Sequence, residues 1–258
     1  MIFSNIVIIS IAGFFSGVIK TGVGVGSGIF LLPTLSLAFP AKIALGLGAP
    51  MLLASDIIGL RYYWKQWLPR AELGRLFLAA LPGLFLGTVL LPLIPGGVFR
   101  TCVGLFGACY ALSHLWPNFP LAQVLKKIFG RLSAASAGQQ SSHAFGAYFY
   151  GFLGGLCTVL AHAGGLVWSL YLITTTRDRR VFVGTTIILF FATNIYKTIS
   201  YLYIDIISIN TMLQVVPAIP MILLGSYLGN IINKKFNQIL FRKIVLLFIM
   251  LISISLCI

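Results

Sequence analysis

The stretch Gly13-Phe14-Phe15-Ser16-Gly17 is matched, 138 residues later, by Gly151-Phe152-Leu153-Gly154-Gly155. The same offset, without a gap, also pairs Gly26 with Gly164, Gly46 with Gly184, Tyr63 with Tyr201, Pro82 with Pro220 and Gly87 with Gly225. Most of these shared residues are Gly and Pro, which constrain backbone geometry, so the two copies are expected to share the same backbone course. Two copies of one plan in a long apolar chain are typical of secondary transporters, whose site lies between the copies.

The composition indicates a membrane protein. Hydrophobic residues make up 59% of the 258 residues and charged residues only 9%, whereas a soluble domain has roughly 25% charged residues. Lipid permits only helices or closed barrels, and the apolar runs are continuous rather than alternating, which excludes the barrel pattern. We therefore expect an all-α, polytopic membrane protein. The apolar stretch 1–19 has no basic region before it and is expected to be a retained span, not a cleaved signal.

The net charge of +14 does not indicate nucleic-acid binding. The basic residues stand in short clusters between apolar stretches, where such residues orient a membrane chain and meet anionic lipid. The cysteines lie within apolar segments and none forms a C-x-x-C pair, so we interpret them as structural thiols. They are Cys102, Cys109, Cys157 and Cys257.

The chain divides into two sets of apolar segments. We expect a first transmembrane repeat at 1–120, a linker with a short amphipathic helix at 121–143, and a second repeat at 144–258. The apolar segments are 4–19, 29–39, 43–60, 76–94 and 101–116, then 146–160, 166–175, 181–203, 211–231 and 244–258. A full span needs about 20 residues, so the second segment of each copy is too short to cross.

Two topologies fit these segments. If the first two segments of each copy join into one kinked span, the copies run parallel. If the second segment folds back as a hairpin, the copies are inverted. In the inverted arrangement, the basic loop residues lie on one side of the membrane, and only Lys42 and Arg100 lie on the other. In the parallel arrangement, the basic residues are divided almost evenly between the two sides. The positive-inside rule therefore favours two inverted repeats, each a broken helical hairpin plus three transmembrane helices, with both termini outside the cytoplasm.

Both hairpins turn at breaks rich in small residues. Glycine lets the backbone unwind and lets a ligand approach its N–H groups. Each break also begins a short arm, whose first amides lack partners and carry the positive end of the helix dipole. Two such ends brought together would bind an anion; the alternative is that the glycines only permit close helix packing. The predicted site residues are Gly24, Gly26, Ser27 and Gly28 in the first break and His162, Gly164 and Gly165 in the second.

The residues around the breaks resemble a known family. Gly13-x3-Gly17 followed by Gly24-x-Gly26-Ser27-Gly28-x4-Pro33 resembles the N-terminal signature of the sulfite and organosulfonate exporters, TauE/SafE. Ala161-His162-Ala163-Gly164-Gly165, Phe182-Val183-Gly184-Thr185 and Asn194-x2-Lys197 resemble the corresponding half of one branch. The resemblance covers nearly the whole chain and implies transport of small sulfur-containing anions such as sulfite or sulfonates.

Ionisable residues inside spans are costly in lipid and usually functional. Asp56, whose repeat partner is Asn194, is predicted to link transport to protons; the alternative is a structural carboxylate. Asn194 and Lys197 are predicted to contact the substrate, although Lys197 could instead form a salt bridge, for example to Asp56, or snorkel to the surface. Lys20 is a coupling or gating candidate that could also snorkel to the surface. His162 could donate to an oxyanion, carry a proton, or simply cap a helix.

These features together predict a secondary transporter, a permease of small sulfur-containing anions in the cytoplasmic membrane. We expect alternating access with proton or ion coupling, partners limited to the anion and the lipid bilayer, and no cofactor, metal or nucleic acid. A membrane enzyme is one alternative, but His114, His143 and His162 lack metal-ligand spacing and no catalytic triad is present. A non-transporting scaffold subunit is another, and it leaves both glycine-rich breaks unexplained.

Overall fold

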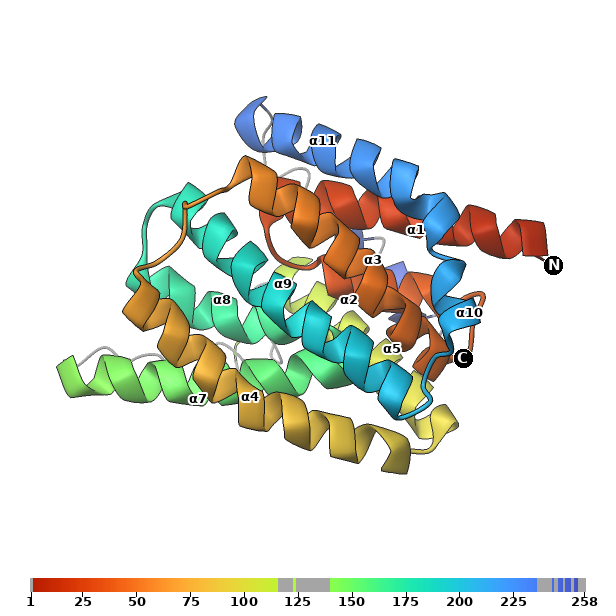
Figure 1. Cartoon of the computed structure of the whole chain (residues 1–258), viewed down its shortest axis with the longest axis horizontal. Helices are drawn as coiled ribbons and strands as arrows, with labels where there is room; N and C mark the ends of the chain where they lie inside the picture. The colour runs from red at the N-terminus through yellow and green to blue at the C-terminus, as the bar shows by residue number, and fades with distance from the viewer. Residues whose placement is uncertain are drawn as a thin grey trace.

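The computed structural model describes residues 2–115 and 140–235, together with residue 123 and several residues between 243 and 254. Every regular element in this part is a helix (Figure 1), which confirms the expected all-α fold. The helices are α1 (Ile2–Val23), α2 (Ser27–Leu35), α3 (Ala41–Tyr62), α4 (Arg70–Leu93), α5 (Gly96–Leu115), α7 (Gln140–Ala161), α8 (Gly164–Thr175), α9 (Arg179–Tyr203), α10 (Ile209–Leu213), the 3-10 turn η1 (Val216–Ala218) and α11 (Ile219–Lys235).

Within the described residues, 5 helical stretches are long and apolar enough to cross a bilayer. They are Ile6–Val23, Ala41–Tyr62, Arg70–Leu93, Arg179–Tyr203 and Ile209–Asn233. Large apolar side chains also cover the outer faces: Leu78 and Phe85 of α4 are 63% and 66% exposed. Such surfaces suit lipid rather than water, so the chain is a multi-pass membrane protein.

α1 with α2, and α7 with α8, form two helical hairpins. Between α1 and α2 the chain turns at Gly24 and Gly26, whose φ angles of 87° and 97° are rarely adopted by residues with a side chain. α2 then folds back along α1, with the Phe15 and Phe30 rings 5.9 Å apart. α8 folds back in the same way, and Trp168 packs against the second half of α7. α2 and α8 hold 9 and 12 residues, too few to cross a bilayer.

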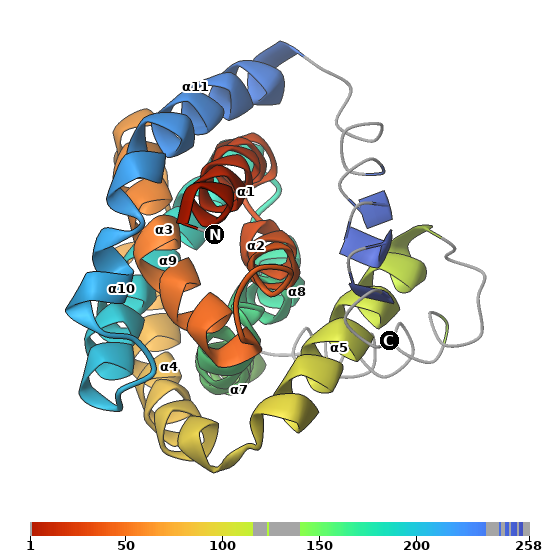
Figure 2. The ribbon, with the colours of Figure 1, turned by 90° about the vertical axis from the view of Figure 1, so that its right-hand side faces the viewer.

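Contacts between the helices follow the offset of the sequence repeat. α1 packs along α11 and α4 along α7, while α3 packs on α9. Figure 2 shows α1, α2, α8 and α7 in one row, with α11, α3, α9 and α4 in a row beside it. The Tyr63 hydroxyl donates to the Thr21 carbonyl over 2.9 Å, and the equivalent Tyr201 hydroxyl donates to the Val159 carbonyl over 2.6 Å. Equivalent residues thus make equivalent bonds.

The equivalent helices α3 and α9 run in opposite directions (Figure 1). At one end Arg180, near the start of α9, donates from Nε to the side chain of Gln66, beyond the end of α3, over 2.6 Å. At the other end Gly46, near the start of α3, lies against Ile207, beyond the end of α9. Opposite directions for equivalent helices are what inverted copies require. The orientation of the copies in the membrane stays a prediction.

Four predicted segments differ from the structure or lie wholly or partly outside the described residues. The segment predicted at 211–231 is divided into α10, η1 and α11, because Pro217 lacks an N–H and disfavours helix at the residue before it. α7 begins at Gln140, earlier than the predicted 146. The rest of the predicted linker at 121–143, apart from residue 123, lies outside the described residues, as does much of the segment predicted at 244–258.

The inverted topology predicts which loops a membrane-impermeant reagent reaches. Cysteines that replace Arg70 or Arg179, in a cysteine-free background, should not react with an impermeant maleimide added to intact cells. A cysteine that replaces Arg100 should react. All three positions are exposed, so accessibility in detergent is the positive control. Labelling of positions 70 and 179 from outside would rule out the inverted arrangement.

Candidate functional site

The two breaks lie against each other. A Cβ on Gly28, at the start of α2, would overlap the carbonyl oxygen of His162 in the break between α7 and α8. A Cβ on Gly165, at the start of α8, would lie 3.4 Å from Val25 Cγ1 in the break between α1 and α2. Gly28 therefore permits a backbone approach that a side chain would prevent, whereas a Cβ on Gly165 would overlap the Phe190 ring, 2.6 Å away. The N-termini of the two short arms, from opposite copies, meet at one place.

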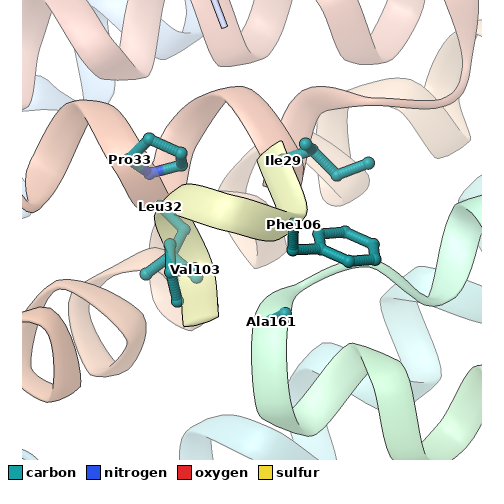
Figure 3. Close-up of a pocket in the computed structure, with 6 residues that line it drawn as sticks. All are labelled: Ile29, Leu32, Pro33, Val103, Phe106 and Ala161. Carbon is teal, nitrogen blue, oxygen red and sulfur yellow. The ribbon is translucent and has the colours of Figure 1, made fainter. Parts of the chain in front are cut away.

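A pocket beside this meeting point is apolar and holds no charged group (Figure 3). Ile29, Leu32 and Pro33 of α2, Val103 and Phe106 of α5, and Ala161 at the end of α7 line it. Without a polar side chain it offers nothing to a charged ligand. The polar chemistry lies instead in a separate cluster of side chains that are closed to solvent.

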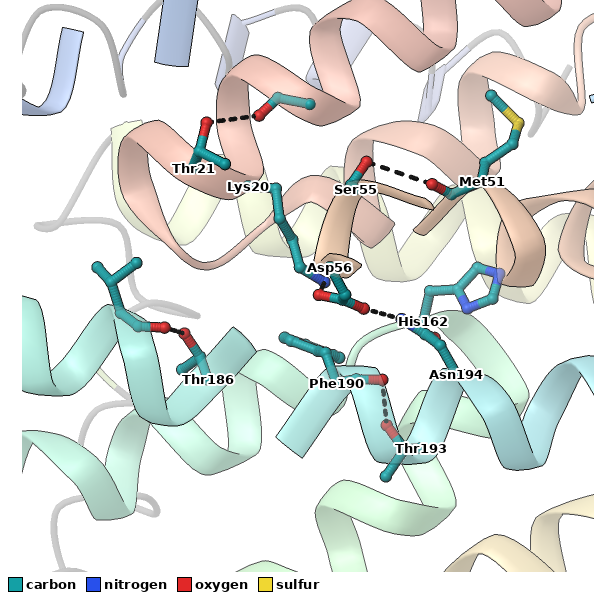
Figure 4. A network of polar contacts seen from close by, with 12 residues as sticks. Lys20, Thr21, Met51, Ser55, Asp56, His162, Thr186, Phe190, Thr193 and Asn194 are labelled. Atoms are coloured by element: carbon teal, nitrogen blue, oxygen red, sulfur yellow. Dashed lines mark hydrogen bonds and ion pairs between the residues drawn. The ribbon is translucent and has the colours of Figure 1, made fainter. Parts of the chain in front are cut away.

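A buried ion pair joins three helices there (Figure 4). Lys20 Nζ of α1 lies 2.7 Å from Asp56 Oδ1 of α3, and neither side chain is exposed. Asn194 of α9 donates from Nδ2 to Asp56 Oδ2 over 2.6 Å. Lys20 Nζ also lies 3.9 Å from the centre of the Phe190 ring, a cation–π contact that supports its charge. Lys20 therefore does not snorkel to the surface, and Asp56 contacts its own repeat equivalent.

A second buried cation, Lys197 of α9, lies one turn beyond Asn194. Its Nζ donates to His162 Nδ1 over 2.8 Å, to Thr158 Oγ1 over 3.2 Å and to the Thr158 carbonyl over 3.3 Å. All three acceptors are neutral. Lys197 also interacts electrostatically with Lys20 and Asp56, so both cations belong to one buried cluster.

The contacts of His162 fix its tautomer. Nε2 lies 2.9 Å from the Leu45 carbonyl oxygen, and because a carbonyl only accepts, Nε2 carries the proton. Nδ1 is then left with a lone pair that accepts from Lys197, so the imidazole is neutral. His162 has φ 51°, an unusual angle for a residue other than glycine and one that often marks functional sites. A Cβ on Gly48 would lie 2.5 Å from Nε2, so Gly48 makes room for the ring.

The cluster holds more basic groups than acidic ones. The chain has 4 acidic side chains, and of these only Asp56, which pairs with Lys20, lies in the cluster. Glu72 accepts from the Tyr171 hydroxyl, Asp178 caps the start of α9, and Asp205 is exposed. Among the described residues Lys197 thus has no carboxylate partner, although it is completely buried. Uncompensated buried charge is costly and calls for a ligand or a functional explanation.

The model of the family described as sulfite exporter TauE/SafE matches residues 9–256. The chain belongs to the TauE/SafE family. This confirms the resemblance found around the breaks and places the protein in a family of transporters. No curated protein and no solved structure matches the chain.

The predicted glycines of this TauE/SafE chain have different surroundings. Gly24 and Gly26 both have positive φ; a Cβ on Gly26 would meet only Ile19 Cγ2 at 4.0 Å, while one on Gly24 would lie 3.0 Å from a Val183 methyl group. A Cβ on Gly164 would lie 2.5 Å from a backbone oxygen of α7. Gly26 is thus required for backbone conformation and Gly164 for helix packing. Ser27 is buried as the first residue of α2.

The sequence did not predict several residues that belong to the buried cluster. Thr158 and Phe190 both contact its lysines, and Gly48 and the Leu45 carbonyl position His162. One signal was available: Phe190, Asn194 and Lys197 are spaced i, i+4, i+7, which places them on one face of a helix. The contacts of Thr158, Gly48 and Leu45 depend on tertiary structure and have no local signal.

Proposed function

We propose that the protein is a secondary transporter that moves a small sulfur-containing anion, such as sulfite or an organosulfonate, across the cytoplasmic membrane. The observation that carries this proposal is Lys197: a fully buried amino group whose three acceptors are all neutral. It lies beside the place where the two short-arm N-termini meet. An anion between them would receive backbone N–H donors and both helix dipoles, as well as the Lys197 charge.

Exchange of the anion requires the buried cluster to open to each side in turn. Two contacts at opposite ends of the α3–α9 pair support alternating access. At one end Gly184 lies against the backbone of Gln66, and the Gln66 side-chain Oε1 accepts from Arg180 Nε. At the other end Gly46, the repeat equivalent of Gly184, lies against Ile207. We propose these two end contacts as gates that open alternately, as the two repeats rock about the central site.

Coupling to protons is assigned to Asp56. It is the one carboxylate of the buried cluster within the described residues, and it holds Lys20 and Asn194 by direct contacts. Protonation of Asp56 would release Lys20 from the ion pair, and a group whose protonation changes a buried pair can link the proton to the transported anion.

Transport itself is tested in proteoliposomes. Purified protein should give saturable uptake of radiolabelled sulfite or methanesulfonate above that of protein-free vesicles, and unlabelled anion inside the vesicles should accelerate it by exchange. Gly74→Ala is a matched control that should transport normally, because a Cβ there meets no atom within 4 Å. Recovery of a chemically altered anion would indicate an enzyme, and uptake no greater than in empty vesicles would contradict transport.

A further inference from the structure

The excess charge of the cluster bears on which anions it accepts. Lys20 and Asp56 cancel each other across 2.7 Å, and His162 is neutral in the tautomer that its contacts require. Lys197 has only neutral acceptors, so its ammonium form leaves one positive charge. Because uncompensated charge is costly to bury, the anion that fits best brings the sum to zero. A monoanion does so, whereas a dianion would leave one buried negative charge.

A proton on Asp56 changes this sum. Lys20 and Lys197 then carry two positive charges with no opposing carboxylate in the cluster, which matches a dianion. We infer, on the basis of the proposed function, that Asp56 sets the charge of the cargo. A monoanion binds while Asp56 is ionised, and a dianion binds only together with one proton on the Asp56 carboxylate.

Asn194 suits both states of Asp56. Its Nδ2 donates to Asp56 Oδ2 over 2.6 Å, while its own Oδ1 is buried without a hydrogen-bond partner. An amide carries both a donor and an acceptor. An ionised Asp56 accepts from Nδ2, and a protonated Asp56 can donate to Oδ1 once the amide has turned. The Asp56–Asn194 pair thus keeps a hydrogen bond in either protonation state of the carboxyl group.

The other groups that face Asp56 do not offer an equivalent proton site. Lys20 comes from α1 and Lys197 from α9; His162, which contacts Lys197, comes from the break before α8. His162 has no free nitrogen while Nδ1 accepts and Nε2 donates. α2 and α10 carry no ionisable side chain, and Arg100 of α5 and Tyr227 of α11 are exposed. The proton that accompanies a dianion is thus placed on Asp56.

The charge of a sulfur anion therefore determines whether a proton on Asp56 must accompany it. Organosulfonates with one acidic group are permanent monoanions and would bind without a proton. Sulfite interconverts between hydrogensulfite and a dianion near neutral pH; hydrogensulfite would bind alone, and the dianion would bind with Asp56 protonated. Both forms of sulfite therefore carry the same totals across the membrane, one proton and one net negative charge. A permanent dianion such as thiosulfate would always take up one proton.

Calorimetry on the purified full chain measures this proton directly. Methanesulfonate and thiosulfate are titrated in two buffers of different ionisation enthalpy, which gives the number of protons taken up per anion. We expect none for methanesulfonate and about one for thiosulfate. By linkage, thiosulfate affinity should fall about tenfold per pH unit as the pH rises above the range in which Asp56 ionises, while methanesulfonate affinity stays constant.

The Asp56→Asn variant tests the assignment. Thiosulfate should bind it without proton uptake and independently of pH, and Asp205→Asn, at an exposed acid, should behave as the wild type. If the wild type binds thiosulfate without a proton, or Asp56→Asn still takes one up, the inference is overturned. If Asp56→Asn does not fold, the wild-type proton count decides. If the wild type binds neither anion, the proposed function fails instead.

Discussion

Lys197→Met should abolish measurable anion binding without unfolding the protein. A charge-assisted contact in a buried site contributes about 2–5 kcal/mol, which corresponds to a loss of affinity of about 30-fold or more. Methionine keeps the length and the packing of the lysine stem. The unliganded variant should unfold near the wild-type temperature, because removal of an uncompensated buried charge offsets the hydrogen bonds lost to Thr158 and His162.

A ligand that binds only the folded state raises its unfolding temperature, so thermal shifts with sulfite and methanesulfonate measure this loss. Lys42→Met is the matched control. Lys42 donates to the Pro92 carbonyl at an exposed position over 3.2 Å, so both its stability and its ligand-induced shift should stay at the wild-type values. A normal ligand-induced shift in Lys197→Met would remove Lys197 from the site.

The second large effect is expected at Gly48. A Cβ there would lie 2.5 Å from His162 Nε2 and 3.0 Å from Cδ2, so Gly48→Val must displace the imidazole ring. His162 could then no longer hold both the Leu45 carbonyl and Lys197. We expect loss of anion binding together with about 1–3 kcal/mol of destabilisation from overpacking.

The double variant Gly48→Val/His162→Ala separates the two effects. Removal of the ring relieves the overlap, so stability should recover in a non-additive manner, while anion binding should remain weak. His162→Ala alone should weaken binding by the roughly 1.5–3 kcal/mol of a hydrogen bond to a charged group. If Gly48→Val bound the anion with the wild-type affinity, the position of the His162 ring would not matter for anion binding.

Much of this fold could be predicted because its signals are local or periodic. The glycine-rich breaks, the short arms after them and the long apolar helices follow from composition and segment length. The contact between Asp56 and Asn194 follows the repeat: residues near a two-fold axis meet their own equivalents, and these two are related by the offset of 138. The repeat offset thus predicts a contact between two residues that are far apart in the sequence.

The partners of the lysines could not be predicted in this way. The sequence allowed Lys197 to pair with Asp56 and Lys20 to snorkel, whereas the structure pairs Lys20 with Asp56 and places Lys197 on neutral acceptors. The choice depends on how α1 lies against α3 and α9, which no local pattern reports. The equivalent glycines Gly26 and Gly164 likewise differ in backbone conformation and in what surrounds them: Gly26 has φ 97°, and a Cβ on Gly164 would overlap α7.

Selenite, a heavier analogue of sulfite, offers the most direct test of an anion held at Lys197. Anomalous scattering from crystals of the selenite-bound protein locates the selenium atom. We expect one strong selenium peak within hydrogen-bonding distance of Lys197, between the N-termini of α2 and α8. We expect no such peak in Lys197→Met. Selenium found only at the exposed Arg177, Arg179 and Arg180, with none at the buried cluster, would contradict this expectation.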